Sequence, residues 1–153
     1  MLSVGDQAPS FDLPDSDMNP VLAEDLVGKP YVIYFYPKDD TPGCTVEAIE
    51  FTDLMSEFEA LGVLVLGVSK DSCVSHAAFR DKYGISVQLV ADMDGQLCEA
   101  YDVWREKEKD GVKKMGILRS TFVVDAKGVV RHALYDVKPK GHAAAVLALV
   151  EAL

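Results

Sequence analysis

The chain has 153 residues, of which 49% are hydrophobic and 26% are charged, as is typical of one globular domain that can bury a substantial core. Its formal net charge of −10 argues against nucleic acid and anionic membranes as binding partners. Three cysteines, an odd number, do not make a secreted disulfide framework, so we expect a protein of the reducing cytoplasm.

The N-terminal part of the chain predicts short elements and no targeting segment. Residues 1–6 contain no basic stretch followed by an apolar core, so we expect no signal peptide. Segments 11–13 and 21–22 flank the turn 14–17 and predict a small hairpin, and residues 22–26 predict one helical turn. No apolar run in the sequence approaches the roughly 20 residues needed to cross a bilayer.

A cysteine stands where a predicted strand passes into a predicted helix. The apolar run Tyr31–Tyr36 predicts a buried strand, and residues 45–61 predict a helix. Between them, Thr41 suits the N-cap and Pro42 the first helical position. Cys44 then lies in the first turn, where unpaired backbone N–H groups and the helix dipole favour a thiolate. The thiolate is the nucleophilic form of cysteine.

The local pattern leaves alternatives open. The Thr41 hydroxyl either caps the helix or points at the sulfur and its substrate. A dithiol oxidoreductase would carry a second cysteine at position 41, so that class is disfavoured. The alternative to a reactive thiol is a capped helix with a small buried cysteine in its first turn.

After this helix, the chain predicts further alternating strands and helices, and then a hairpin. The predicted strands are 63–68, 89–91, 121–124 and 129–135, the predicted helices are 72–83, 96–101 and 143–153, and the charged segment 105–112 is interpreted as a solvated loop.

This order of elements predicts an α/β protein with a thioredoxin-like fold, in which helices flank a central mixed sheet and residues 1–153 form a single domain. The early strands should pair in parallel through crossover helices, and the late hairpin should form an antiparallel edge. Cys44 would then lie at the carboxyl end of a central strand, where open α/β sheets commonly place their sites.

Other candidate sites are weak. Cys73 and His76 have metal-ligand spacing, but no second pair lies near them, so a surface histidine beside a core cysteine is the preferred interpretation. Residues 92–95 resemble the start of a calcium loop without its remaining ligands, and they predict a turn. His132 and His142 have no evident catalytic partner. We therefore expect neither a metal nor a cofactor.

The loop before the helix resembles a known active-site motif. Pro37, Thr41 and Cys44 form the pattern Pro-x-x-x-Thr-x-x-Cys, which is similar to that of peroxiredoxins. The longer segment 36–45 resembles the branch called bacterioferritin comigratory protein, or peroxiredoxin Q. Similarity extends over nearly the whole chain, through the segments 5–13, 67–72, 92–95, 101–104 and 116–125, the last of which resembles the strand that carries the family's active-site arginine, here Arg119.

The resemblance implies a thiol peroxidase that reduces hydrogen peroxide and organic hydroperoxides through a cysteine sulfenic acid. By this resemblance Cys44 is the nucleophile, Arg119 holds the thiolate and the peroxide oxygens, Thr41 orients the peroxide, and Pro37 shields the pocket from water. Glu47 either orients Arg119 through a charged pair or faces solvent in the first helical turn. The branch also implies a monomer that is recycled by thioredoxin or a similar dithiol.

The resolving thiol is the open part of this expectation. Many members of the branch carry it in the same helix, at the position that Ile49 occupies here, so a disulfide within that helix is excluded. Other members carry it in the helix 72–83, close to Arg80. Cys73 is a candidate in that helix, Cys98 is frequent in the branch without being its usual resolving residue, and a one-cysteine mechanism is the alternative.

A second hypothesis belongs to another functional class. A redox-sensing or chaperone-like binding protein would use Cys44 as a switch rather than as a catalyst. Stoichiometric oxidation without turnover would distinguish this function from that of a peroxidase.

Overall fold

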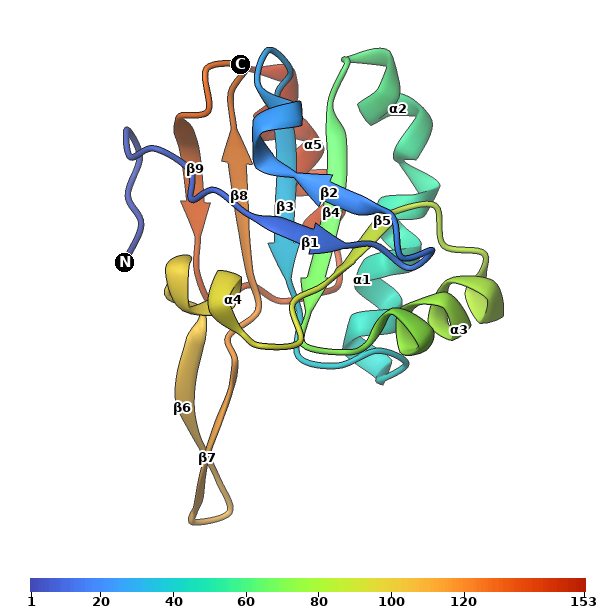
Figure 1. Ribbon diagram of the computed structural model, residues 1–153, viewed down its shortest axis with the longest axis vertical. Helices are drawn as coiled ribbons and strands as arrows, with labels where there is room; N and C mark the ends of the chain where they lie inside the picture. The colour runs from blue at the N-terminus through green and yellow to red at the C-terminus, as the bar shows by residue number, and fades with distance from the viewer.

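A five-stranded mixed sheet with the strand order β5-β4-β3-β8-β9 forms the centre of the computed structural model, which describes residues 1–153 (Figure 1). Strand β3 pairs in parallel with β4, which pairs in parallel with β5, whereas β8 is antiparallel to both β3 and β9. The strands are β3 (Tyr31–Phe35), β4 (Leu64–Ser69), β5 (Gln88–Ala91), β8 (Ser120–Val124) and β9 (Val130–Leu134). The predicted thioredoxin-like arrangement, with a parallel part and an antiparallel edge, is confirmed.

Both faces of the sheet are covered (Figure 1). One face packs against α1, α2, α3 and α5, and the other against α4 and the hairpin of β1 and β2. These elements are α1 (Pro42–Asp53), α2 (Met55–Ala60), α3 (Cys73–Tyr83), α4 (Gln96–Ala100), α5 (His142–Glu151), β1 (Asp12–Pro14) and β2 (Pro20–Leu22), followed by a 3₁₀ turn at Ala23–Leu26. The predicted N-terminal hairpin and helical turn are therefore present.

Strand β3 shows why the sheet is buried on both faces. Val32 and Tyr34 point into the core beneath α1 and α5, and Tyr31, Ile33 and Phe35 point into the core beneath α4. Alternate side chains of a strand face opposite sides of a sheet, so a strand covered on both sides reads as a continuous apolar run. All five residues of β3 are buried, and the sequence consequently gives a clear signal for this strand.

The predicted helix 45–61 is corrected at both ends and in its middle. It begins earlier, at Pro42, and the chain leaves the α-helical geometry at Leu54, where φ is −100° and ψ is 6°. The buried residues Phe51, Met55 and Phe58 continue the helical spacing across this break. Apolar periodicity therefore could not reveal that the segment is two helices.

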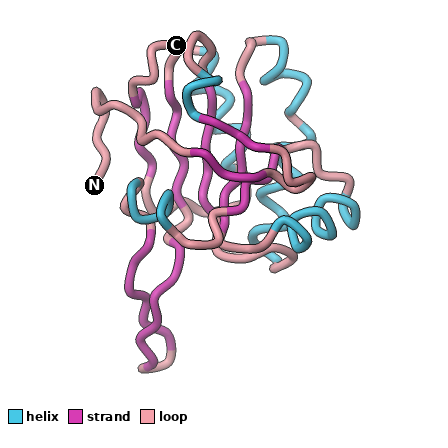
Figure 2. The backbone as a smooth tube through the Cα atoms, in the orientation of Figure 1, coloured by secondary structure: helices cyan, strands magenta, loops and turns pink.

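The segment 105–112, predicted as a solvated loop, belongs to a two-stranded hairpin. Strand β6 (Trp104–Lys109) pairs antiparallel with β7 (Val112–Ile117), and the hairpin extends away from the central sheet (Figures 1 and 2). Its turn consists of Asp110 and Gly111, which have φ angles of 54° and 78°. Two residues with positive φ are what a tight type I′ hairpin turn requires, and Asp-Gly is a preferred pair there.

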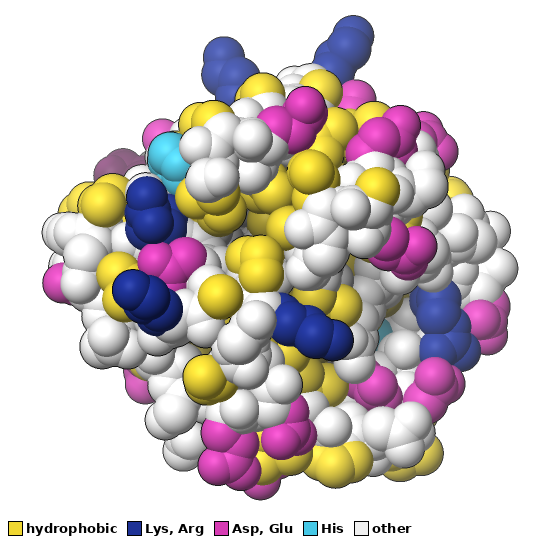
Figure 3. Space-filling view, turned by 90° about the horizontal axis from the view of Figure 1, so that it is seen from above, with side chains coloured by type: hydrophobic (Ala, Val, Ile, Leu, Met, Phe, Trp, Pro, Cys, Tyr) yellow, Lys and Arg dark blue, Asp and Glu magenta, His cyan; other side chains and the backbone are white.

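The hairpin of β6 and β7 lies at one end of the molecule (Figure 1). The other end, where β3 begins, carries acidic and basic side chains interspersed with apolar atoms (Figure 3). None of the helices is both long and apolar enough to span a lipid bilayer.

Candidate active site

Cys44 lies just beyond the carboxyl end of the central strand β3, as predicted. It is the third residue of α1 and is 2% exposed. Thr41 occupies the N-cap position with an extended backbone, and Pro42 is the first helical residue. The backbone N–H groups of the first helical turn have no partner within the helix, so they and the helix dipole favour negative charge at this end.

Of the two orientations predicted for the Thr41 hydroxyl, capping of α1 is wrong. The hydroxyl instead donates a hydrogen bond to the carbonyl oxygen of Lys38 at 2.8 Å. The first helical hydrogen bond is instead made by main-chain atoms, from the Thr45 N–H to the Thr41 carbonyl at 2.9 Å. The hydroxyl therefore closes the loop that precedes the helix. Pro37, at the start of that loop, is exposed.

Arg119 brings a positive charge to the cysteine. It lies in the short link between β7 and β8, and not within a strand as its sequence context suggested. Its Nη2 donates to Cys44 Sγ at 3.4 Å, and its Nη1 donates to Glu47 Oε1 at 2.7 Å. One guanidinium group thus contacts the sulfur and a carboxylate at the same time, which the planar fork of arginine donors permits.

Glu47 faces Arg119, and the solvent-facing alternative is wrong, because its side chain is 0% exposed. Its Oε2 has no hydrogen-bond partner. Burial raises the pKa of Glu47 to about 7, although the positive charge of Arg119 opposes the rise. Burial lowers the pKa of Arg119, but the negative charges of Glu47 and Cys44 outweigh this effect, so its pKa is raised.

The buried carboxyl group gives a prediction about stability. Glu47 ionises at about 7 in the folded protein and near 4.5 when solvated, so ionising it costs the folded state about 1.4 kcal/mol for each intervening pH unit. The favourable contribution is complete below the lower value and is lost as the pH rises through the upper one. From pH 4 to pH 8, the unfolding free energy of wild type should therefore fall by about 3 kcal/mol relative to that of Glu47→Gln, whose side chain stays uncharged.

Urea unfolding of both proteins across this pH range measures the difference. Glu59→Gln, at an exposed position of α2, is the matched control, since it makes the same change from carboxylate to amide outside the core. Parallel curves for wild type and Glu47→Gln would show that Glu47 titrates normally.

Gly43 provides the space through which Arg119 reaches the sulfur. A Cβ atom at this position would lie 3.1 Å from Arg119 Nη2 and 3.4 Å from Pro139 Cγ. A side chain here would therefore require Arg119 or Pro139 to shift, and Arg119 is the residue that contacts Cys44.

A histidine lies close to this site, and it has a partner that the sequence did not reveal. His142 is the first residue of α5, and its Nε2 lies 2.7 Å from the Thr121 hydroxyl oxygen. Burial, together with the positive charge of Arg119, lowers the pKa of His142 to about 4. This imidazole is consequently neutral at pH 7 and adds no charge beside the arginine.

The other two cysteines differ in accessibility, and no disulfide is present. Cys73 is the first residue of α3 and is half-buried. Cys98 is 0% exposed, more deeply buried than the half-buried residue expected. Burial and the neighbouring Asp92 carboxylate raise the pKa of Cys98, which makes it a poor nucleophile.

Two acidic residues of the loop, Asp39 and Asp40, were missed by sequence reasoning. Asp40 accepts hydrogen bonds from the Lys82 ammonium at 2.7 Å and from the Tyr83 hydroxyl, both on α3. Asp39 is buried and contacts His76 of the same helix. The expected surface histidine is thus wrong, since His76 is 0% exposed whereas Cys73 is half-buried. Acidic residues in a loop resemble ordinary solvated charges, so no local pattern identified them.

Comparison with known proteins agrees with this geometry. The model of the AhpC/TSA family matches residues 4–133. Peroxiredoxin Bcp of Xanthomonas campestris is 50% identical over 121 residues, which cover 79% of this chain and 76% of that protein.

Two solved structures are also similar. That of the Xanthomonas campestris bacterioferritin comigratory protein has a TM-score of 0.89 and 44% sequence identity, and the match covers 93% of this chain and 90% of the other. That of a cysteine-to-serine variant of Xylella fastidiosa PrxQ has a TM-score of 0.94 and 38% identity, covering 99% and 97%. The chain therefore belongs to the AhpC/TSA family, as a peroxiredoxin of the bacterioferritin comigratory protein, or peroxiredoxin Q, branch.

Proposed function

We propose that Cys44 is the nucleophile with which this peroxiredoxin reduces hydroperoxides. Its thiolate attacks one peroxide oxygen, the O–O bond breaks, and the sulfur becomes a sulfenic acid. The other oxygen leaves with the bonding electron pair and takes up a proton, which yields water or an alcohol. The observation that carries this proposal is the 3.4 Å contact between Arg119 Nη2 and Cys44 Sγ, at the first turn of α1.

In this proposal Arg119 has two tasks. Its positive charge stabilises the thiolate before the reaction, and its N–H donors stabilise the charge that grows on the leaving oxygen. Glu47 holds the guanidinium in place from the other side. By the family resemblance, Thr41 orients the peroxide and Pro37 limits the access of water.

We propose hydrogen peroxide and small organic hydroperoxides as the substrates. The structure of the Xanthomonas campestris relative was determined in connection with its alkyl peroxide reduction activity, which favours alkyl hydroperoxides for this chain as well. Stopped-flow oxidation of the reduced protein by hydrogen peroxide and by tert-butyl hydroperoxide tests both classes. If one class of hydroperoxide fails to oxidise Cys44, that class is not a substrate.

For the next step, we propose Cys73 as the resolving thiol. It is half-buried at the start of α3, and the neighbouring residues Asp71 and Ser75 both bond to Asp39 of the active-site loop. A disulfide requires Cα atoms roughly 4.4–6.8 Å apart, so any larger separation of Cys44 and Cys73 must be closed by a movement of α1 or α3. An external dithiol such as thioredoxin then reduces the disulfide.

Mass spectrometry of the protein oxidised by one equivalent of peroxide tests the resolving residue. We expect an intramolecular disulfide in wild type and in Cys98→Ser, and its loss in Cys73→Ser. Sulfenic acid that persists in all three proteins would indicate one-cysteine chemistry, and a disulfide lost only in Cys98→Ser would assign that residue instead.

The proposed catalytic cycle is tested by turnover with NADPH, thioredoxin reductase and thioredoxin. Continuous NADPH oxidation that depends on added peroxide is the expected result. Oxidation of Cys44 in a single stoichiometric event, with no turnover by any dithiol, would instead indicate the redox-sensing protein.

We further propose that residues 1–153 form one domain that acts as a monomer in the cytoplasm. Both apolar clusters share the same sheet, which supports one cooperative unit. We expect light scattering at catalytic concentrations to give the mass of a single chain. We also expect denaturation to show a single unfolding transition.

A further inference from the structure

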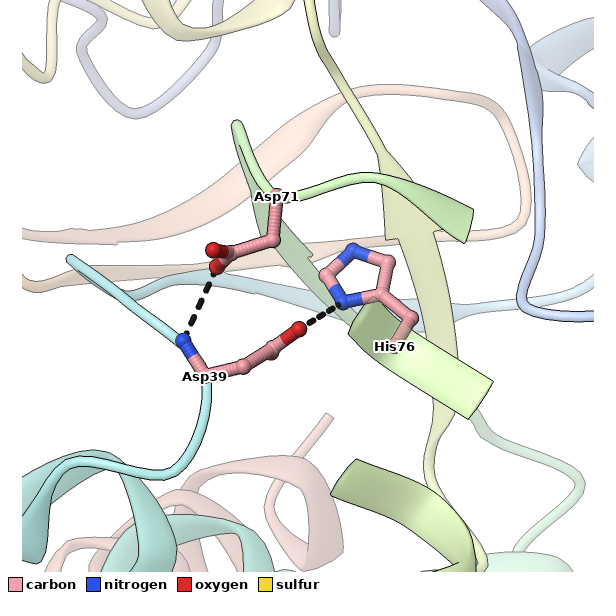
Figure 4. Close-up of side chains that lie close together, drawn as sticks. All are labelled: Asp39, Asp71 and His76. Carbon is pink, nitrogen blue, oxygen red and sulfur yellow. Dashed lines mark hydrogen bonds and ion pairs between the residues drawn. The ribbon is translucent and has the colours of Figure 1, made fainter. Parts of the chain in front are cut away.

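A polar cluster, in which Asp39 and His76 are buried and Asp71 is half-buried, joins the active-site loop to α3 (Figure 4). Asp39 lies in the loop between β3 and α1, Asp71 in the turn before α3, and His76 within α3. The Nδ1 atom of His76 lies 2.7 Å from Asp39 Oδ2, and the Asp39 N–H donates to Asp71 Oδ2 at 2.9 Å. The side chain of Asp39 therefore holds the loop to α3, and its main-chain N–H holds the loop to the turn before α3.

The surroundings of His76 determine where its protons are. Its Nε2 lies 3.0 Å from the carbonyl oxygen of Val90, which only accepts hydrogen bonds, so Nε2 carries a proton. Its Nδ1 lies 2.7 Å from Asp39 Oδ2 and 3.3 Å from the Tyr36 hydroxyl oxygen, so Nδ1 carries a proton when Asp39 is ionised. With Asp39 ionised, the ring therefore has protons on both nitrogens and is a positively charged imidazolium.

Asp39 is surrounded as an ionised carboxylate should be. Its Oδ1 accepts from the Tyr36 hydroxyl at 2.5 Å, and its Oδ2 accepts from the Ser75 hydroxyl at 2.8 Å in addition to His76. The two hydroxyl donors, one on each carboxyl oxygen, favour the ionised form of this buried group independently of His76. A buried ion pair is tolerated when further hydrogen bonds satisfy the remaining donors and acceptors, as they do here.

A metal site is the other interpretation of this cluster. One ligand atom each from Asp39, Asp71 and His76 lie within 4.8 Å of one another. However, both His76 nitrogens already face oxygen atoms, and Asp71 Oδ2 already accepts from the Ser69 hydroxyl at 2.6 Å and from the Asp39 N–H. The donors that satisfy these atoms occupy the places that an ion would need, so we assign no metal.

We propose that His76 is a positioning residue for peroxide reduction, and that its imidazolium, ion-paired with Asp39, fixes the loop that carries Pro37 and Thr41 in front of Cys44. Thr41 stands two residues after Asp39, and α1 begins at the next residue. A shift of Asp39 therefore moves the N-terminal end of α1, and with it the cysteine. This inference rests on the assignment of Cys44 as the peroxide-reducing residue.

NMR of the ring nitrogens tests the charge state directly. In reduced wild-type protein at neutral pH, we expect both nitrogens of His76 to be protonated and to exchange slowly with water, since the ring is 0% exposed. In Asp39→Asn the carboxylate is lost, and His76 should then carry a single ring proton. One ring proton in wild type would overturn the proposal without reference to any variant.

Kinetics test the positioning role. The second-order rate constant for oxidation of Cys44 should fall by about ten- to a hundred-fold in Asp39→Asn and in His76→Asn, because displacement of reacting groups by about 1 Å has an effect of this size. The double variant should be no slower than either single variant, since all three have lost the same ion pair. His132→Asn, in strand β9, is the matched control and should react as wild type does.

Circular dichroism verifies that each variant is folded before its rate is measured. Asp39→Asn keeps the shape of its side chain and remains informative if His76→Asn does not fold. A folded Asp39→Asn protein that reacts at the wild-type rate would overturn the proposal. If instead wild type itself is not oxidised by peroxide, the assignment of Cys44 fails and not the positioning role.

Discussion

Peroxide consumption by Cys44→Ser is expected to fall to the background rate. A serine hydroxyl remains protonated at neutral pH, even beside a guanidinium group, and it cannot form the sulfenic acid on which turnover depends. The substitution is nearly isosteric, so the fold should persist although the site is buried. Peroxide remaining after incubation with a dithiol reductant measures the effect.

The control for this experiment is Cys98→Ala. Cys98 lies on α4 and packs into the core, away from the contacts of Arg119. Its removal should leave the rate of peroxide reduction close to that of wild type. Peroxide turnover by folded Cys44→Ser would exclude Cys44 as the nucleophile.

Arg119→Ala is expected to slow the oxidation of Cys44 by about 10²-fold or more, as removal of one charge-stabilising donor does in other active sites. The variant removes the hydrogen bond to the sulfur and also leaves Glu47 buried without its positive partner. Stopped-flow measurement of the reaction with peroxide provides the rate constant.

Two further variants make this result interpretable. Arg119→Lys retains a positive charge but cannot span Cys44 and Glu47 with two coplanar donors, so we expect a rate between those of wild type and Arg119→Ala. Arg131→Ala removes an exposed arginine paired with Asp125 and should have no effect. A near-normal rate in Arg119→Ala would exclude this residue from the reaction.

The sequence predicted the features that depend on residues close together in the chain, such as helix ends and buried strands. Pro42 and Cys44 lie in the first helical turn as expected, because capping preferences act within a few residues. The apolar run of β3 predicted a strand buried on both faces, and the alternation of strands and helices predicted the mixed sheet around it.

Features that depend on tertiary contacts were beyond local patterns. Sequence patterns left two equal alternatives for Glu47, and only the approach of Arg119 from the link between β7 and β8 decides between them. The hairpin of β6 and β7 has mostly exposed residues, so it lacks the alternation that reveals a half-buried strand. The sequence around His76 is typical of a surface histidine, and only the tertiary contact with Asp39, which is distant in the sequence, explains its burial.

The space beside Gly43 restricts how this chain can change over evolutionary time. Every other amino acid has a Cβ atom, so each replacement at this codon would place carbon where the guanidinium approaches the sulfur. Gly5 and Gly28 have open space around them and are required only for their backbone angles. Position 43 should therefore tolerate fewer substitutions than positions 5 and 28, and a saturation library selected for peroxide resistance should be enriched in glycine there.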